Sequence, residues 1–142
     1  MDIAKLIRDR QGPVYSCNTA TTVTEAASVL AERRIGALPV VSGDEVVGIF
    51  SERDLLYCIA QEGAAALERQ VGEVMTSPPV TVARDTDALE ALSLMTRRRI
   101  RHLPVVESGR MLGFISIGDL VKLRVEAAEA EAEAMRVYIQ TA

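Results

Sequence analysis

The sequence contains no tryptophan and only one histidine, and aromatic residues make up 4% of its 142 positions. Few aromatic rings are therefore available to stack on the bases of single-stranded nucleic acid. The net charge of −4 also lacks the broad basic surface that DNA- and RNA-binding proteins present. These two deficits predict a protein that does not bind nucleic acid.

Long apolar runs, metal-binding clusters and catalytic groupings are missing as well. No stretch reaches the ~18 apolar residues of a membrane-spanning helix, and the first residues lack a signal-peptide core. Cys17 and Cys58 stand apart, and His102 has no neighbouring metal ligand or nucleophile. We therefore expect no metal site, no catalytic residues and no membrane contact, and a cytoplasmic location that keeps both thiols reduced.

What the sequence does have is an aliphatic core and an internal repeat. Apolar residues make up 49% of the chain, enough for a packed interior. Pro104 follows Pro39 by 65 residues, and with this offset 15 of 43 aligned positions are identical. Such self-similarity predicts two copies of one structural unit.

Each copy predicts the element order βαββα. In the first copy, apolar residues at helical spacing over 23–31 follow a short strand at 14–17. Two strands at 38–41 and 46–50 then flank a polar turn, and a second helix begins at Ser51. A copy of about 45 residues is too small to fold alone. The fold class predicted is therefore α/β (α+β): two pseudo-symmetric βαββα units packed sheet to sheet, plus a C-terminal helix.

In the second copy the short first strand is expected at 80–82. The predicted domain division is 1–66 for the first unit with an N-terminal turn and connector, 67–123 for the second unit, and 124–142 for the C-terminal helix.

The C-terminal helix carries an apolar stripe spaced 4, 3, 4, 3 and 4 residues apart, as in a coiled coil. Its members are Val121, Val125, Ala128, Ala132, Met135 and Ile139. Two interpretations stay open: the helix lies back on its own domain, or it packs on a partner subunit and helps the chain to dimerise.

A basic cluster and a Ser-x-x-Asp motif stand out as candidates for ligand binding. Arg101 and His102 lie just before a Leu-Pro strand, and the next strand ends at Ser116-x-x-Asp119. A guanidinium can bind phosphate in a bidentate manner, and a rigid carboxylate can accept hydrogen bonds from a ribose diol. Ser-x-x-Asp is also a helix capping box, so both roles stay open.

The paired motifs resemble a known family. Ile-Gly-Ala-Leu-Pro-Val-Val at 35–41 and Ile-Arg-His-Leu-Pro-Val-Val at 100–106 are each followed by a Gly-x-x-Ser-x-x-Asp-Leu segment, at 48–55 and 113–120. This arrangement is similar to tandem cystathionine β-synthase (CBS) domains, whose pair is called a Bateman module. The resemblance covers residues 3–123.

The resemblance implies a stand-alone regulatory module that is not an enzyme and needs no cofactor. It implies that a cleft between the copies binds an adenosine-containing ligand, such as AMP, ADP, ATP or S-adenosylmethionine. It also implies a homodimer that regulates a protein the sequence does not name. The alternative is a ligand-free dimeric scaffold or adaptor that acts through protein–protein contacts.

Transferred onto this sequence, the family pattern predicts two half-sites. The richer site consists of Thr21, Ala26, Ile35, Arg101, His102, Phe114, Ser116 and Asp119. The weaker site consists of Ile49, Ser51, Asp54, Thr86, Ala91 and Ile100. It is expected to be weaker because Gly36 and Ala37 stand where Arg101 and His102 stand in the other copy.

Overall fold

The computed structural model describes residues 3–10 and 14–141, and it contains the two predicted βαββα units. The first half of the chain forms α1 (Ile3–Arg8), β1 (Cys17–Asn18), α2 (Val23–Arg33), β2 (Ala37–Ser42), β3 (Glu45–Ser51), α3 (Glu52–Glu62) and the 3-10 helix η1 (Gly63–Glu68). The second half forms α4 (Val71–Val74), α5 (Ala88–Arg98), β4 (His102–Glu107), β5 (Arg110–Ser116) and α6 (Ile117–Thr141).

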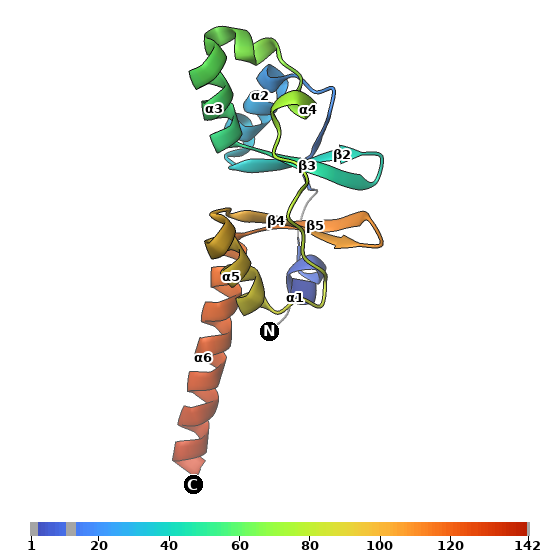
Figure 1. Cartoon of the computed structure of the whole chain (residues 1–142). Helices are drawn as coiled ribbons and strands as arrows, with labels where there is room; N and C mark the ends of the chain where they lie inside the picture. The colour runs from blue at the N-terminus through green and yellow to red at the C-terminus, as the bar shows by residue number, and fades with distance from the viewer. Residues whose placement is uncertain (1–2, 11–13, 142) are drawn as a thin grey trace.

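The two units stack with their sheets facing each other and their helices outside (Figure 1). Helices α2, α3 and α4 cover the outer face of the β2–β3 hairpin, while α1, α5 and α6 lie on the outer side of the β4–β5 hairpin. Each unit has its own apolar cluster, one around Phe50 and Leu38 and the other around Met95 and Leu103. The predicted mixed fold with two stacked units and a C-terminal helix is confirmed.

The strands repeat the sequence symmetry residue for residue. Ala37 pairs with Ser51 in the first hairpin, and His102 pairs with Ser116 in the second. The strand order is β1-β2-β3-β5-β4, but β3 and β5 pair only at their hairpin ends, through Glu45 and Arg110. The two hairpins therefore meet at one end and diverge along the rest of their length, where side chains can line a cavity.

The segments that lead into the two units are exchanged in space. Ile3 of α1 is buried in the core of the second unit, and Val71 of α4 is buried in the core of the first. Ile7 lies against Gly113 of β5, and Met75 lies against Gly48 of β3. Each hairpin thus carries on its surface the lead-in segment of the other unit, so the predicted division 1–66 and 67–123 describes chain order rather than packing.

Two predicted elements differ from the structure. The strand expected at 14–17 is reduced to Cys17–Asn18, and the one expected at 80–82 to a single bridge between Val82 and Val105. Pro78 and Pro79 come directly before the strand expected at 80–82, and neither has a backbone N–H that could extend its hydrogen bonding to β4. The helix expected over 124–142 is the continuation of α6, because no glycine or proline interrupts the chain between Val121 and Thr141.

In residues 3–10 and 14–141, no helix has both the length and the apolar composition needed to cross a bilayer. Cys17 and Cys58 are buried and are not joined to each other. Burial raises the pKa of the Cys17 thiol to about 11, so this thiol stays protonated. The cytoplasmic location stays a prediction.

Candidate functional site

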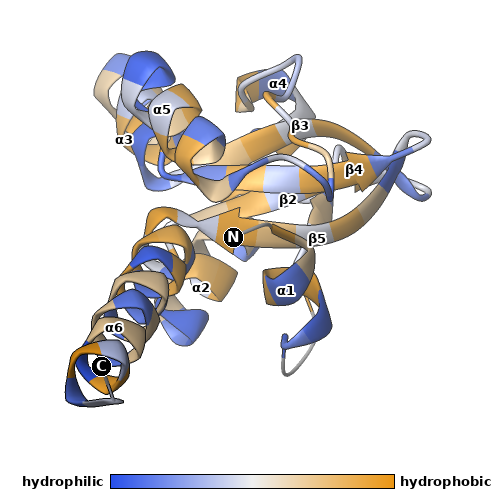
Figure 2. Ribbon diagram, turned by 90° about the horizontal axis from the view of Figure 1, so that it is seen from below, coloured by the Kyte–Doolittle hydropathy of each residue, from blue (hydrophilic) through white to orange (hydrophobic). Residues whose placement is uncertain are grey.

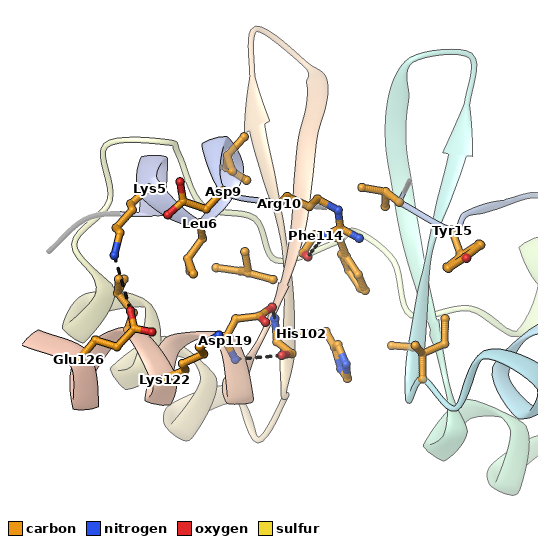
Figure 3. Close-up of a pocket in the computed structure, with 17 residues that line it drawn as sticks. Lys5, Leu6, Asp9, Arg10, Tyr15, His102, Phe114, Asp119, Lys122 and Glu126 are labelled. Carbon is orange, nitrogen blue, oxygen red and sulfur yellow. Dashed lines mark hydrogen bonds and ion pairs between the residues drawn. The ribbon is translucent and has the colours of Figure 1, made fainter. Parts of the chain in front are cut away.

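A cavity of about 470 Å³ lies where the two hairpins diverge, bounded by α1, β5 and the first turns of α6 (Figure 3). Five residues of the predicted richer site line it: Ile35, His102, Phe114, Ser116 and Asp119. Ile35 and Ala37 come from the first unit, so the cavity wall contains residues of both copies.

Ser116 and Asp119 are held together at the start of α6. The Ser116 backbone N–H donates to Asp119 Oδ2 at 2.8 Å, and the Asp119 N–H donates to Ser116 Oγ at 3.1 Å. This reciprocal pair is a capping box, so the capping role is present. It uses only one carboxylate oxygen: Oδ1 of Asp119 has no hydrogen bond within the described part of the chain. A rigid, singly occupied carboxylate thus faces the cavity.

An aromatic pair forms the wall next to this carboxylate. The rings of His102 and Phe114 stack with centroids 5.5 Å apart and planes inclined by 12°. Burial, followed by the nearby Arg101 guanidinium, lowers the pKa of His102, while the Asp119 and Glu52 carboxylates act in the opposite direction. The imidazole is therefore neutral at pH 7 and contributes an apolar, polarisable surface rather than a charge.

Gly36 of the first unit makes room for that imidazole. A Cβ atom at position 36 would lie 3.2 Å from His102 Cε1, closer than comfortable van der Waals contact. The small Gly36 is the repeat counterpart of Arg101. The two copies therefore differ in a complementary way: Gly36 leaves space in the first copy, and His102 of the second copy places its ring there.

Arg101 does not line the cavity. Its exposed side chain lies 4.0 Å from the Glu52 carboxylate, measured from Nη2 to Oε2. The backbone C=O of Arg101 accepts the Ile117 N–H at 2.9 Å, as the Gly36 C=O accepts the Glu52 N–H at 3.0 Å in the other copy. Arg101 is therefore not among the residues that line this cavity, and its phosphate contact stays a prediction.

The cationic residues that do line the cavity come from the two ends of the chain. They are Lys5, Arg10 and Lys122. Lys5 Nζ lies 3.5 Å from Glu126 Oε2, and Arg10 Nη1 donates to the Phe114 carbonyl at 3.1 Å. The sequence offered no local signal for Lys5 and Arg10, because α1 and the residues after it reach the cavity only through the exchange of lead-in segments, whereas Lys122 follows Asp119 on α6.

Thr21 and Ala26, also predicted for the richer site, lie elsewhere. Thr21 Oγ1 accepts the Asn18 N–H at 3.1 Å and so closes the turn before α2. Ala26 is fully buried in the core of the first unit. A helical position that looks small and ligand-facing in the sequence is here a packing position.

The weaker predicted half-site has the same Ser-x-x-Asp helix start as the richer one, but a different residue lies next to its carboxylate. Asp54 Oδ2 accepts the Ser51 N–H at 2.8 Å and is bonded to the Ser51 hydroxyl at 3.0 Å. Asp54 Oδ1 accepts the Thr76 hydroxyl at 2.9 Å. Thr76 also exchanges two backbone hydrogen bonds with Ile49, at 2.9 and 3.0 Å. Both oxygens of this carboxylate are occupied, and the chain at Thr76 pairs with the strand beside it.

The other three residues of the weaker half-site have structural partners. Thr86 Oγ1 accepts the Ala83 N–H at 3.0 Å, Ala91 is fully buried, and Ile100 packs on the second core. None of the six lines the cavity described above. Across residues 3–10 and 14–141, no three His, Cys, Asp or Glu side chains are grouped so that they could hold a metal ion.

The family profile of the CBS domain matches this chain twice, at residues 3–61 and 71–126. The chain belongs to the CBS domain family. Its two matches form a CBS pair, and the predicted family membership is confirmed. The match begins within α1 and ends within α6, so the elements that close the cavity on both sides lie inside it.

Known CBS proteins share this architecture. A CBS-domain containing protein from Agrobacterium tumefaciens is 37% identical, with 87% of this chain and 99% of that chain aligned at a TM-score of 0.82. CBSX2, solved in complex with AMP, is 26% identical over 89% of this chain and 98% of its own, at a TM-score of 0.77. The mitochondrial protein CBSX3 of Arabidopsis thaliana is 38% identical over 129 residues, and this chain spans 63% of its length.

Proposed function

We propose that this chain is a regulatory module that binds an adenosine-containing ligand in the cavity between its CBS repeats. The observation that carries the proposal is the Asp119 carboxylate, which is fixed by Ser116, lines the cavity and has an oxygen, Oδ1, that no group of residues 3–10 and 14–141 hydrogen-bonds. A carboxylate in this position can accept hydrogen bonds from the two hydroxyls of a ribose. The crystal structure of the relative CBSX2 with AMP supports the choice of ligand class.

The lining on either side of Asp119 suits the other two parts of a nucleotide. Apolar surface from Tyr15, Ile35 and the Phe114–His102 stack can enclose an adenine ring. Lys122 and Arg10 line the cavity as cations, and the first turn of α6 adds the partial positive charge of a helix start. The ligand would thus contact α1, both repeats and α6 at once.

Contact with both repeats gives a physical route to regulation. A ligand that binds only when the two units are packed as seen here stabilises that packing, by about 2.7 kcal/mol at a hundredfold excess over its Kd. We propose that the module acts as a homodimer and passes this stabilisation to a protein that it regulates. The chain's own role would be to bind and to respond, with no chemical step on the ligand.

The experiment is a thermal-shift panel of AMP, ADP, ATP and S-adenosylmethionine on the wild type, Asp119→Asn and Asp54→Asn. At least one ligand is expected to raise the Tm of the wild type and of Asp54→Asn, and to leave that of Asp119→Asn unchanged. A Tm that no ligand moves would favour the ligand-free scaffold. A shift that Asp119→Asn retains in full would place the site elsewhere.

A further inference from the structure

Helix α6 continues far beyond the unit to which it belongs (Figure 1). Leu120 and Leu123 near its start are buried in the second core, but every residue over 128–141 is exposed. Most helices in proteins are stabilised by packing of an apolar face rather than by propensity alone. The free half of α6 still carries large apolar side chains, among them Met135 and Ile139, and hydrophobic colour reaches its end in Figure 2.

These apolar residues continue one stripe along the whole helix, which we call the α6 stripe. It consists of Val121, Val125, Ala128, Ala132, Met135 and Ile139. At 100° per residue all six fall within a narrow sector of the helix surface. Val121 and Val125 are each 48% exposed, whereas Leu120 and Leu123 on the other side of the same turns are buried. The stripe therefore faces away from its own domain, which excludes the interpretation that it lies back on it.

The charges beside the stripe indicate what can cover it. One flank carries Arg124 and Glu131, and the other carries Glu129 and Arg136. When two copies of a coiled-coil helix lie parallel and in register, each residue of the first flank meets the residue five positions later on the second flank of the other helix. Arg124 then meets Glu129 of the second copy, and Glu131 meets Arg136 of the second copy. Both contacts are attractive.

The antiparallel arrangement is less favourable. An antiparallel pair places each flank of the stripe against the same flank of the second copy. When the whole stripe is aligned, Lys122 opposes Arg136 of the second copy and Glu129 opposes its own equivalent. In the same register Glu131 also opposes its own equivalent, so neither flank carries an attractive charge pair. The sequence therefore favours a second copy of this chain in parallel orientation over an antiparallel one.

We propose that two copies of the chain pair through a parallel, in-register contact of their α6 stripes. This rests on the homodimer of the proposed function and adds its surface and orientation. The cavity residues Asp119, Lys122 and Glu126 lie on the domain side of the same helical turns. The two ligand cavities would then flank the dimer axis, each separated from it by the width of one helix.

The surface is tested on the full chain by light scattering coupled to size-exclusion chromatography. Val125→Lys places a charge in the α6 stripe, and Val137→Lys is its matched control, since Val137 is 50% exposed on the same helix but lies off the stripe. The wild type and Val137→Lys are expected to be dimers, and Val125→Lys to need at least about tenfold more protein to dimerise. Circular dichroism checks that all three keep their helix content.

The outcomes separate the two proposals. A wild type that is monomeric at every concentration contradicts the homodimer itself and leaves ligand binding untouched. A Val125→Lys variant that dimerises like the wild type contradicts only the stripe, and means that a different surface joins the copies.

The orientation is tested by mild oxidation of Met135→Cys, with Val137→Cys as the control. Both native cysteines are buried, so the new thiol is the accessible one in the described chain. Parallel in-register pairing brings two residues at position 135 together, and a covalent dimer is expected for Met135→Cys alone. Dimers that do not cross-link at position 135 would contradict the parallel arrangement.

Discussion

The two helix starts of the repeat, Ser51–Asp54 and Ser116–Asp119, have the same residues and nearly the same capping geometry but different surroundings. In the first, the Thr76 hydroxyl occupies the second oxygen of Asp54, and Thr76 pairs with the strand at Ile49. In the second, the corresponding oxygen of Asp119 faces a cavity. The difference arises outside the motif, in the lead-in segment that each hairpin receives from the other unit.

This contrast shows that the motif positions a carboxylate but does not by itself create a ligand site. On the strand beside Asp54, the backbone of the neighbouring lead-in pairs directly with Ile49. On the strand beside Asp119, the partner of the Phe114 carbonyl is the long side chain of Arg10. A side chain of that length can move aside or bind a ligand, whereas a paired backbone cannot.

The largest difference is expected between Gly48→Ala and Gly113→Ala, which alter equivalent positions of the two hairpins. A Cβ at Gly48 would lie 2.9 Å from the Thr76 carbonyl oxygen, whereas a Cβ at Gly113 would meet the flexible end of Ile7. Gly48→Ala is expected to lower the free energy of unfolding by about 3 kcal/mol and Gly113→Ala by about 1 kcal/mol. Urea unfolding measures both. Equal losses would mean that the two lead-in segments hold their strands equally tightly.

A smaller difference is expected between Asp54→Ala and Asp119→Ala. Asp54→Ala removes the acceptor of the Ser51 N–H, the Ser51 hydroxyl and the Thr76 hydroxyl, for a loss of about 2 kcal/mol, while Asp119→Ala removes the acceptor of the Ser116 N–H, for about 1 kcal/mol. The same unfolding experiment, without ligand, compares them. A larger loss for Asp119→Ala would contradict the assignment of Asp54 to structure and Asp119 to binding.

Substitutions at Gly36 and Arg101, which are equivalent in the repeat, test the cavity wall. Gly36→Val would push the His102 ring toward the cavity and is expected to weaken nucleotide binding about tenfold, equal to about 1.4 kcal/mol. Arg101→Ala is expected to change affinity less than threefold, since that exposed side chain is not part of the cavity lining and lies near Glu52. Isothermal titration with the ligand from the thermal-shift panel measures both. A large loss of nucleotide affinity in Arg101→Ala would indicate that the guanidinium contacts the phosphate after all.

The smallest expected effect is on the pH dependence of stability. It concerns the second copy alone, since His102 titrates and its repeat counterpart Ala37 does not. The pKa of His102 is lowered in the folded chain, so the unfolded chain binds more protons once the pH falls below about 6.5. Stability from the neutral imidazole is present above that pH and is lost as the pH falls toward the folded pKa. His102→Gln should therefore lose less stability than the wild type between pH 7.5 and 5.5, by under about 1 kcal/mol. Identical pH profiles in urea unfolding would show that His102 is not buried as described.

The repeat, the hairpins and both helix caps could be predicted from the sequence because they depend on local spacing. The offset that aligns Pro39 with Pro104 also places both hairpins in the same register.

The composition of the site could be predicted only in part. Ser116, Asp119, His102 and Phe114 share one hairpin and one helix start, so the motif brings them together. The entry of Lys5 and Arg10, and the closure of the other half-site by Thr76, depend on the exchange of lead-in segments between units. In that exchange α1 packs on the second unit and α4 on the first. These contacts join segments far apart in the sequence, so no local pattern predicts them.

We propose that the Ser116–Asp119 half-site takes up ligand and that the Ser51–Asp54 half-site does not, and the stoichiometry of binding distinguishes the two. Isothermal titration of the wild type with the nucleotide that stabilises it should give one ligand per chain. Asp54→Asn should give the same value, and Asp119→Asn no measurable binding. Two ligands per chain in the wild type, falling to one in Asp54→Asn, would show that the half-site beneath Thr76 is open after all.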